Sequence, residues 1–241
     1  MKKKKQKGKK RLSVDQRMDL LLAQHEEGEV SPWRIFKIIT EFVKGFEFLK
    51  KLDKAATIFG TARCRPTDPL YHEAHALAYQ LAKAKFAVIT GGGPGVMEAA
   101  NKGAKDAHGK SIGINIQLPH EQRTNPYVTQ SESFNYFFTR KVMLSFASEV
   151  YIFFPGGFGT LDEFYEIVTL VQTQKITPIP VVLVGKEFWS PLLKWMEEAM
   201  YKKNKAISKK DMTTYHLVDS ADEAFRLIKR LVKGDHQSYT I

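Results

Sequence analysis

Residues 150–163 read VYIFFPGGFGTLDE, and this segment indicates the class of fold to which the chain belongs. Its first five residues are apolar, which is typical of a strand that is buried on both faces of a sheet. The glycines of 155–160 then mark a tight turn, and the residues that follow have the apolar spacing of a helix. The segment is therefore a strand–turn–helix unit of an α/β protein.

Short apolar strands and amphipathic helices alternate along the chain on both sides of this segment. The expected strands are Ala56–Phe59, Ala87–Thr90, Ile112–Ile116, Val150–Phe154, Pro180–Val184 and Tyr215–Val218, with a further short strand at Tyr127–Ser131. The expected helices are Leu70–Lys85, Val96–His108, Tyr136–Ala147, Leu161–Gln174, Pro191–Lys202 and Ala221–Lys233. This alternation predicts a Rossmann-like, doubly wound parallel sheet with helices on both faces.

The region before the first expected strand differs from the rest of the chain. From Val14 to Leu49 apolar residues recur at helical spacing, and Ser31-Pro32 is a typical helix start. We therefore predict three parts: a disordered basic tail over 1–11, a helical extension over 12–54, and a Rossmann-like nucleotide-binding domain over 55–241. The apolar face of the extension is expected to cover the sheet or another subunit.

The formal net charge of +11 comes mainly from the N-terminal tail. Residues 1–11 hold seven lysines and Arg11 and no acid, which leaves 29 basic and 26 acidic residues in the remainder. Such a tail can touch nucleic acid or anionic lipid without specificity, although a solvated tail is the simpler interpretation. The charge therefore does not define the function.

Membrane, disulfide and metal signatures are missing from the sequence. No apolar run approaches the length that crosses a bilayer, and the N-terminus lacks the apolar core of a signal peptide. Cys64 is the single cysteine, which excludes an internal disulfide, and the seven histidines show no metal-ligand spacing. We expect a cytoplasmic protein without a membrane partner and without a metal or other cofactor.

Three of the expected strands end in turns that contain glycine, at Gly60, at Gly91–Gly95 and at Gly156–Gly159. The carboxyl ends of parallel strands share one edge of the sheet, so these turns would meet there. Glycine lets a backbone approach a ligand closely, and the start of the following helix offers unpaired N–H groups to an anion. One such turn alone would be structural, but three at one edge indicate a phosphate site.

Two common nucleotide-binding signatures do not fit this chain. The pattern G-x-G-x-x-G from Gly91 would require glycine at Val96, and from Gly157 it would require glycine at Asp162. The strand that ends near Asn115 also carries no acidic residue for a ribose diol. No G-x-x-x-x-G-K-[ST] is present either. The sequence therefore disfavours a dinucleotide-dependent dehydrogenase and a P-loop protein.

Three charged residues accompany the last glycine turn. Glu163 is expected in the first turn of the following helix, and Arg140 with Lys141 begins the preceding helical region. A fixed carboxylate can stabilise the positive charge that develops on ribose when its C1′–N bond breaks, and it can orient the attacking water. Taken singly, Glu163 could be an acid favoured by the helix dipole, and Arg140 could form an ordinary surface ion pair.

Together these segments resemble the LOG (Lonely Guy) family. The resemblance rests on Thr139-Arg-Lys-Val-Met143, on the pattern P-G-G-x-G-T-x-x-E at Pro155–Glu163, and on Gly91–Ala99, and it extends from about Ala55 to about Tyr201. The family comprises cytokinin riboside 5′-monophosphate phosphoribohydrolases, long misnamed lysine decarboxylases. Phe138-Thr139 replaces the Met-His that often precedes Arg-Lys, and this departure and the long N-terminal extension point to a longer bacterial branch.

The resemblance implies a reaction and a role for each matching residue. It implies hydrolysis of the N-glycosidic bond of a purine nucleoside 5′-monophosphate, AMP or N6-modified AMP, with Arg140 and Glu163 as the catalytic pair. The implied substrate-binding residues are Gly91, Gly92, Gly93, Glu121, Lys141, Gly156, Gly157, Gly159 and Thr160. It also implies a homodimer or higher homo-oligomer. A nucleotide or phospho-cofactor carrier without turnover, on the same fold, remains the alternative.

Overall fold

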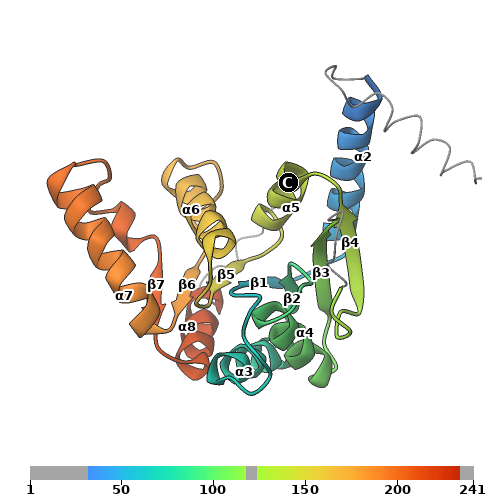
Figure 1. Cartoon of the computed structure of the whole chain (residues 1–241), viewed down its shortest axis with the longest axis horizontal. Helices are drawn as coiled ribbons and strands as arrows, with labels where there is room; N and C mark the ends of the chain where they lie inside the picture. Colours follow the sequence, from blue (N-terminus) through green and yellow to red (C-terminus); the bar gives the residue numbers. More distant parts are fainter. Residues whose placement is uncertain (1–31, 118–123, 234–241) are drawn as a thin grey trace, which may run out of the picture. The chain divides into compact units, whose positions relative to one another are not determined.

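The computed structural model describes residues 32–117 and 124–233. Its centre is a parallel sheet of seven strands in the order β4-β3-β2-β1-β5-β6-β7 (Figure 1). The strands are β1 (Ala55–Phe59), β2 (Ala87–Thr90), β3 (Ser111–Ile116), β4 (Gln130–Phe134), β5 (Val150–Phe153), β6 (Val181–Val184) and β7 (His216–Val218). The helices are α2 (Pro32–Leu49), α3 (Pro69–Lys83), α4 (Val96–Asp106), α5 (Phe137–Ser145), α6 (Phe158–Gln172), α7 (Lys186–Trp195) and α8 (Ala221–Lys233).

Helices pack on both faces of the sheet, which confirms the predicted doubly wound architecture. Helices α3, α4 and α8 cover one face, and α5, α6 and α7 cover the other (Figure 1). On the first face alanines and a glycine bring α3 and α4 close together, because a side chain at Gly103 would collide with the backbone of His75. On the second face Phe164 packs against Phe153 and Trp189, with ring centroids 5.6 and 5.4 Å apart.

The chain divides after Val43 into two compact units. Helix α2 begins at Pro32, as its sequence predicts, and several large apolar side chains before the division are exposed: Trp33, Ile35, Phe36, Ile39 and Val43. Within the second unit the end of α2 packs closely, because a side chain at Gly45 would collide with Met143. The predicted tail over 1–11, and residues 12–31 of the predicted extension, lie outside the described residues. None of the described helices is long and apolar enough to cross a membrane.

The predicted strand Tyr127–Ser131 is wrong in its position. Strand β4 pairs with β3 from Gln130, opposite Ile112, to Phe134, opposite Ile116. The backbone N–H of Tyr127 instead donates to Asn125 Oδ1 at 3.1 Å, so this part of the expected strand is a turn. Strand β4 lies at the edge of the sheet and is mostly exposed, which explains why it lacks the apolar run that marks a buried strand.

The predicted helix Pro191–Lys202 is wrong at its start and in its type. Helix α7 begins at Lys186, directly after Gly185, whose positive φ of 98° makes the sharp turn from β6. The backbone N–H of Lys186 donates to Asp219 Oδ1 at 3.1 Å, which secures this start, and Pro191 lies inside the helix. A π-helix, Met196–Lys203, follows directly. The other predicted elements are present, with ends shifted by only a few residues.

Candidate functional site

The three glycine turns meet at the carboxyl edge of the sheet, as the sequence predicts, where the strand order reverses between β1 and β5. Thr61 connects them: its N–H donates to Pro155 O at 3.0 Å, and its carbonyl accepts from Val96 N–H at 2.9 Å. A side chain at Gly60 would lie 2.7 Å from Val96. At Gly95, which has a positive φ of 71°, a side chain would collide with Thr61 O. The turns after β1, β2 and β5 therefore form one continuous surface.

A buried network of polar side chains holds the Gly91–Gly93 turn in place. Thr90 Oγ1 accepts from Gly92 N–H at 3.0 Å and donates to Asn101 Oδ1 at 2.6 Å. Asn125 Nδ2 donates both to Gly93 O at 3.0 Å and to Asn101 Oδ1 at 2.9 Å. The sequence alone does not predict this network, although it places Asn101 among the apolar positions of a helix. The structure buries this amide fully, and a buried amide requires buried partners.

Helix α6 begins at Phe158, three residues before the predicted Leu161, and this changes the position of Glu163. No acid lies in the first turn, so the prediction that Glu163 falls there is wrong. The helix starts earlier because its N-cap, Gly157, accepts the N–H groups of Thr160 and Leu161 at 3.0 and 3.1 Å. Glu163 therefore lies in the second turn of the helix, where its side chain is buried.

The glycines of this last turn divide into two kinds. A side chain at Gly156 would collide with Thr160 Oγ1, so Gly156 is required for packing. A side chain at Gly157 or Gly159 would meet nothing within 4 Å, so these two glycines border open space. The first N–H groups of a helix lack acceptors within the helix. The start of α6 is therefore open and suited to an anion such as a phosphate.

Arg140 on α5 reaches across the ends of β2 and β3. Its Nε donates to Ile114 O at 2.9 Å, and its guanidinium lies over Gly91, where a side chain would collide with it. Burial lowers the pKa of Arg140, and the nearby Glu163 carboxylate opposes that change. The structure thus brings the two residues that the resemblance pairs into electrostatic contact.

Glu163 is a buried carboxyl group with only 7% of the residue exposed. Its Oε1 lies 3.7 Å from Lys141 Nζ, and its Oε2 is buried without a hydrogen-bond partner in the described part of the chain. Burial raises the pKa of Glu163 to about 7; Lys141 and Arg140 oppose this change, and Glu166 adds to it. A carboxyl group with this pKa can exchange a proton near neutral pH.

Lys141, which the resemblance implies as a substrate ligand, points at acids of α6. Its Nζ lies 2.6 Å from Asp162 Oδ2 and 2.9 Å from Glu166 Oε2. Burial lowers the pKa of Lys141, but these two contacts outweigh burial, and the pKa is raised overall. Glu166 is not among the predicted site residues, although its spacing of three from Glu163 puts both on one helix face. Glu121 lies outside the described residues.

Asn115, at the end of β3, is a further polar residue of this edge. Its Nδ2 donates to Thr124 Oγ1 at 2.8 Å, and its Oδ1 is buried without a partner among the residues described here. A side chain at Gly92 would collide with this oxygen. Gly91 and Gly92 therefore leave room for Arg140 and Asn115, respectively, at adjacent positions of one turn.

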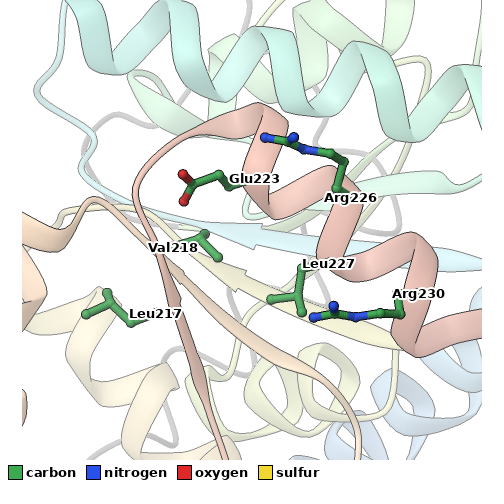
Figure 2. Close-up of a pocket in the computed structure, with 6 residues that line it drawn as sticks. All are labelled: Leu217, Val218, Glu223, Arg226, Leu227 and Arg230. Atoms are coloured by element: carbon green, nitrogen blue, oxygen red, sulfur yellow. The ribbon is translucent and has the colours of Figure 1, made fainter.

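A pocket of about 360 Å³ lies away from the glycine turns, between β7 and α8 (Figure 2). Its apolar part comes from both elements and its charged part from α8. The lining residues are Leu217, Val218, Glu223, Arg226, Leu227 and Arg230. None of the predicted site residues lines it, so this pocket is not part of the candidate site.

A doubly wound parallel sheet with open glycine turns at its switch point defines a Rossmann-like α/β protein with a ligand site at the carboxyl edge. The family model described as possible lysine decarboxylase matches residues 97–228. The chain belongs to this family, the LOG family that its motifs resemble.

Two curated relatives are both called cytokinin riboside 5′-monophosphate phosphoribohydrolase. The one from Rhodococcoides fascians is 26% identical over 132 residues, which cover 52% of this chain and 65% of the relative. The one from Arabidopsis thaliana is 34% identical over 93 residues, which cover 38% of this chain and 41% of the relative. The matched part of the chain thus spans less than two thirds of the length of either relative.

Two solved structures share the fold. The Moco carrier protein of Chlamydomonas reinhardtii is 24% identical with a TM-score of 0.56, over 76% of this chain and 99% of that protein. The molybdenum cofactor binding protein of Rippkaea orientalis is 25% identical with a TM-score of 0.55, over 74% of this chain and 95% of that protein. The same architecture therefore occurs in proteins that are named as binders and carriers.

Proposed function

We propose that this protein is a phosphoribohydrolase that hydrolyses the N-glycosidic bond of a purine nucleoside 5′-monophosphate, AMP or an N6-modified AMP, to free base and ribose 5-phosphate. The observation that carries the proposal is Glu163, a buried carboxyl group with one oxygen unpartnered in the described structure and a pKa of about 7. The names of the two curated relatives support the substrate class.

The proposed substrate matches the spacing between the open start of α6 and Glu163. Its phosphate would bind at the open start of the helix, near Gly157 and Gly159. Glu163 follows Phe158 by five residues, which is about 7–8 Å along a helix axis. A ribose 5-phosphate with its phosphate at the helix start could therefore present its C1′ carbon to the carboxylate. Binding energy from the phosphate would then hold the sugar in the reactive geometry.

Glu163 would act on the step in which the glycosidic bond breaks. Positive charge develops on the ribose as the C1′–N bond lengthens, and a fixed carboxylate in a buried site stabilises that charge. Its Oε2 can accept a proton from the attacking water. The hydroxyl of that water ends on C1′, and one proton ends on the released base. Arg140 would limit the cost of the buried charge on Glu163.

The chemistry of Lys141 favours this reaction over the decarboxylation in the family description. A lysine that forms a Schiff base must become a neutral amine, and its pKa is usually lowered for that purpose. Lys141 instead has a raised pKa, because Asp162 and Glu166 stabilise its ammonium. The lysine closest to the candidate carboxylate is therefore held in its non-nucleophilic form.

A binding protein without turnover is the second candidate, because both solved relatives are named for binding or carrying the molybdenum cofactor. The two candidates differ in what they require of Glu163. Holding an anionic ligand does not require a buried carboxyl group with a pKa of about 7, and its charge would repel such a ligand. Glu163 therefore favours the hydrolase.

Incubation of the protein with AMP separates these candidates. We expect adenine and ribose 5-phosphate to appear in equal amounts, measured by chromatography, with adenosine as the matched substrate that lacks the phosphate. AMP that binds but stays intact would support the carrier. AMP that neither binds nor reacts would contradict hydrolysis of AMP itself, and the same assay with an N6-modified AMP then tests the remaining substrate class.

We also propose that the protein works as a homodimer or a higher homo-oligomer. Large aromatic side chains remain exposed at both ends of α5 and at the start of α6, and exposed apolar patches are typical of protein–protein interaction sites. They are Phe137, Phe138, Phe146 and Phe158, the last of which is 93% exposed. Size-exclusion chromatography with light scattering tests this proposal, and a monomer at micromolar concentration would contradict it.

A further inference from the structure

Lys141 Nζ lies among three carboxylates of a single helix. The nitrogen is 2.6 Å from Asp162, 2.9 Å from Glu166 and 3.7 Å from Glu163. Its ammonium donates a hydrogen bond to Asp162 Oδ2 and forms ion pairs with Glu166 and Glu163. The positive charge of Lys141 is therefore directed at the acids of α6, and less of it is available to a substrate phosphate.

The three acids differ in how exposed their side chains are, from Asp162 at the surface to the buried Glu163. The side chain of Asp162 is 63% exposed, that of Glu166 is 26% exposed, and that of Glu163 is 9% exposed. Lys141 therefore makes its short contacts with the two outer acids and its long contact with the deepest one. The remaining oxygen of Glu163, Oε2, stays buried and unpartnered within the described residues.

We propose that Lys141 and Glu166 are positioning residues that set the protonation of Glu163, and that Lys141 is not a ligand of the substrate. The proposal rests on the proposed function only in taking Glu163 as the carboxylate that acts on the substrate. It replaces the role that family resemblance gives to Lys141, and it adds Glu166 to the site.

The two residues act on Glu163 with opposite signs. Apart from burial, the groups that change the pKa of Glu163 are Lys141 and Arg140 on α5, which lower it, and Glu166 and Asp162 on α6, which raise it. Lys141 also neutralises much of the charge on Glu166. Tyr151 on β5 contributes a neutral phenol, whose hydroxyl donates to Ser145 O at 2.6 Å.

Two substitutions should therefore move the same titration in opposite directions. Lys141→Met removes the positive charge, so Glu163 should lose its proton at a higher pH than in the parent. Glu166→Gln removes a negative charge, so Glu163 should lose its proton at a lower pH. Each shift should be about one pH unit, as is usual for a charge 4–6 Å away. Lys141→Arg keeps the charge and should restore the parental midpoint.

The first measurement is the pH profile of base release at saturating AMP for the parent and these variants. The ionised form of Glu163 is the active one, so the rate should rise with pH, with its midpoint moved up in Lys141→Met and down in Glu166→Gln. The titration of the substrate phosphate is common to all variants and cancels in the comparison. The control is Lys202→Met, which removes a lysine outside the candidate site whose Nζ lies 2.9 Å from Glu197 and 3.0 Å from Glu198. This substitution should leave the midpoint unchanged.

The second measurement needs no turnover. Carbon-13 NMR of glutamate-labelled protein follows the Glu163 carboxyl directly, and Glu163→Gln identifies its resonance by removing it. If AMP is not hydrolysed but the midpoints move in opposite directions, the proposed function fails and this inference stands. If both variants move the midpoint in the same direction, or if neither moves it, the inference is overturned. It is also overturned if Lys141→Met raises KM for AMP far more than for adenosine while the midpoint stays fixed.

Discussion

The proposed catalytic role of Glu163 comes with a cost to stability, because the burial that raises the pKa of its carboxyl group also disfavours its charge. Its pKa in the folded protein is about 7, above the ordinary value of 4.5. The folded state therefore binds more protons than the unfolded state between these two values. Folding stability contributed by this group is present in full below pH 4.5 and is lost as the pH rises toward 7.

Glu163→Gln should accordingly make the protein more stable at pH 8 but not at pH 4, because the buried charge that it removes exists only at the higher pH. The gain in the free energy of unfolding should be roughly 1–3 kcal/mol, which corresponds to a Tm several degrees higher. Differential scanning calorimetry of both proteins at the two pH values measures it. A Tm that falls at pH 8 while it stays unchanged at pH 4 would show that the ionised carboxylate stabilises the fold, and it would contradict this prediction.

Asn101 is the residue whose amide connects the polar network beneath the Gly91–Gly93 turn. Asn101→Ala should lower the free energy of unfolding by about 1–3 kcal/mol, because Thr90 and Asn125 would lose a buried partner. The matched control is Asn204→Ala, which removes an exposed amide that donates to Ala199 O and should cost less. Urea denaturation compares the two variants, and equal losses would contradict the role of the buried network.

At the scale of elements, substitutions in the glycine turns test whether a phosphate binds in the open space at the start of α6. A methyl group at Gly157 meets nothing within 4 Å, so Gly157→Ala should leave Tm unchanged. It should nevertheless raise KM for AMP severalfold and change turnover of adenosine little, because the methyl group would occupy the place of the phosphate. Gly91→Ala is the contrasting variant and should impair both substrates, since its methyl group would displace Arg140. Equal effects of Gly157→Ala on AMP and adenosine would place the phosphate elsewhere.

The sequence predicts an element well where a continuous apolar run marks it. It predicts an element poorly where that run is missing or where a contact with another part of the chain sets the ends of the element. Buried strands such as β1 and β5 are continuous apolar runs, so their positions follow from composition. Strand β4 at the edge has no such signal, and α7 starts where Asp219 secures it rather than at its proline. The glycine turns follow from spacing, whereas the pairing of Arg140 with Glu163 is what the family resemblance implies. The network of Asn101 and the acids around Lys141 do not, because they depend on distances between separate elements.

At the scale of the whole molecule, the basic tail and the helical extension should behave in opposite ways. Deletion of residues 1–11 should leave hydrolysis of AMP intact and remove any salt-sensitive binding of nucleic acid, because these residues carry most of the net charge and no apolar periodicity. Deletion of 1–50 also removes the end of α2, which packs against Met143, and should give aggregated protein or a changed assembly state. Light scattering on both truncations measures the outcome. A soluble, active protein of unchanged assembly state that lacks 1–50 would contradict a packing role for the extension.

The most direct test of the proposed hydrolase compares the parent with Glu163→Gln in release of adenine from AMP, with the affinity for AMP measured on the same samples by calorimetry. The loss of a fixed negative charge at the developing ribosyl cation should slow turnover roughly a hundredfold or more. The affinity for AMP should stay close to that of the parent, since the proposed phosphate site is at the start of α6, away from the substituted carboxyl group. Release of adenine by Glu163→Gln at nearly the parental rate, or a parent that binds AMP and leaves it intact, would contradict the account.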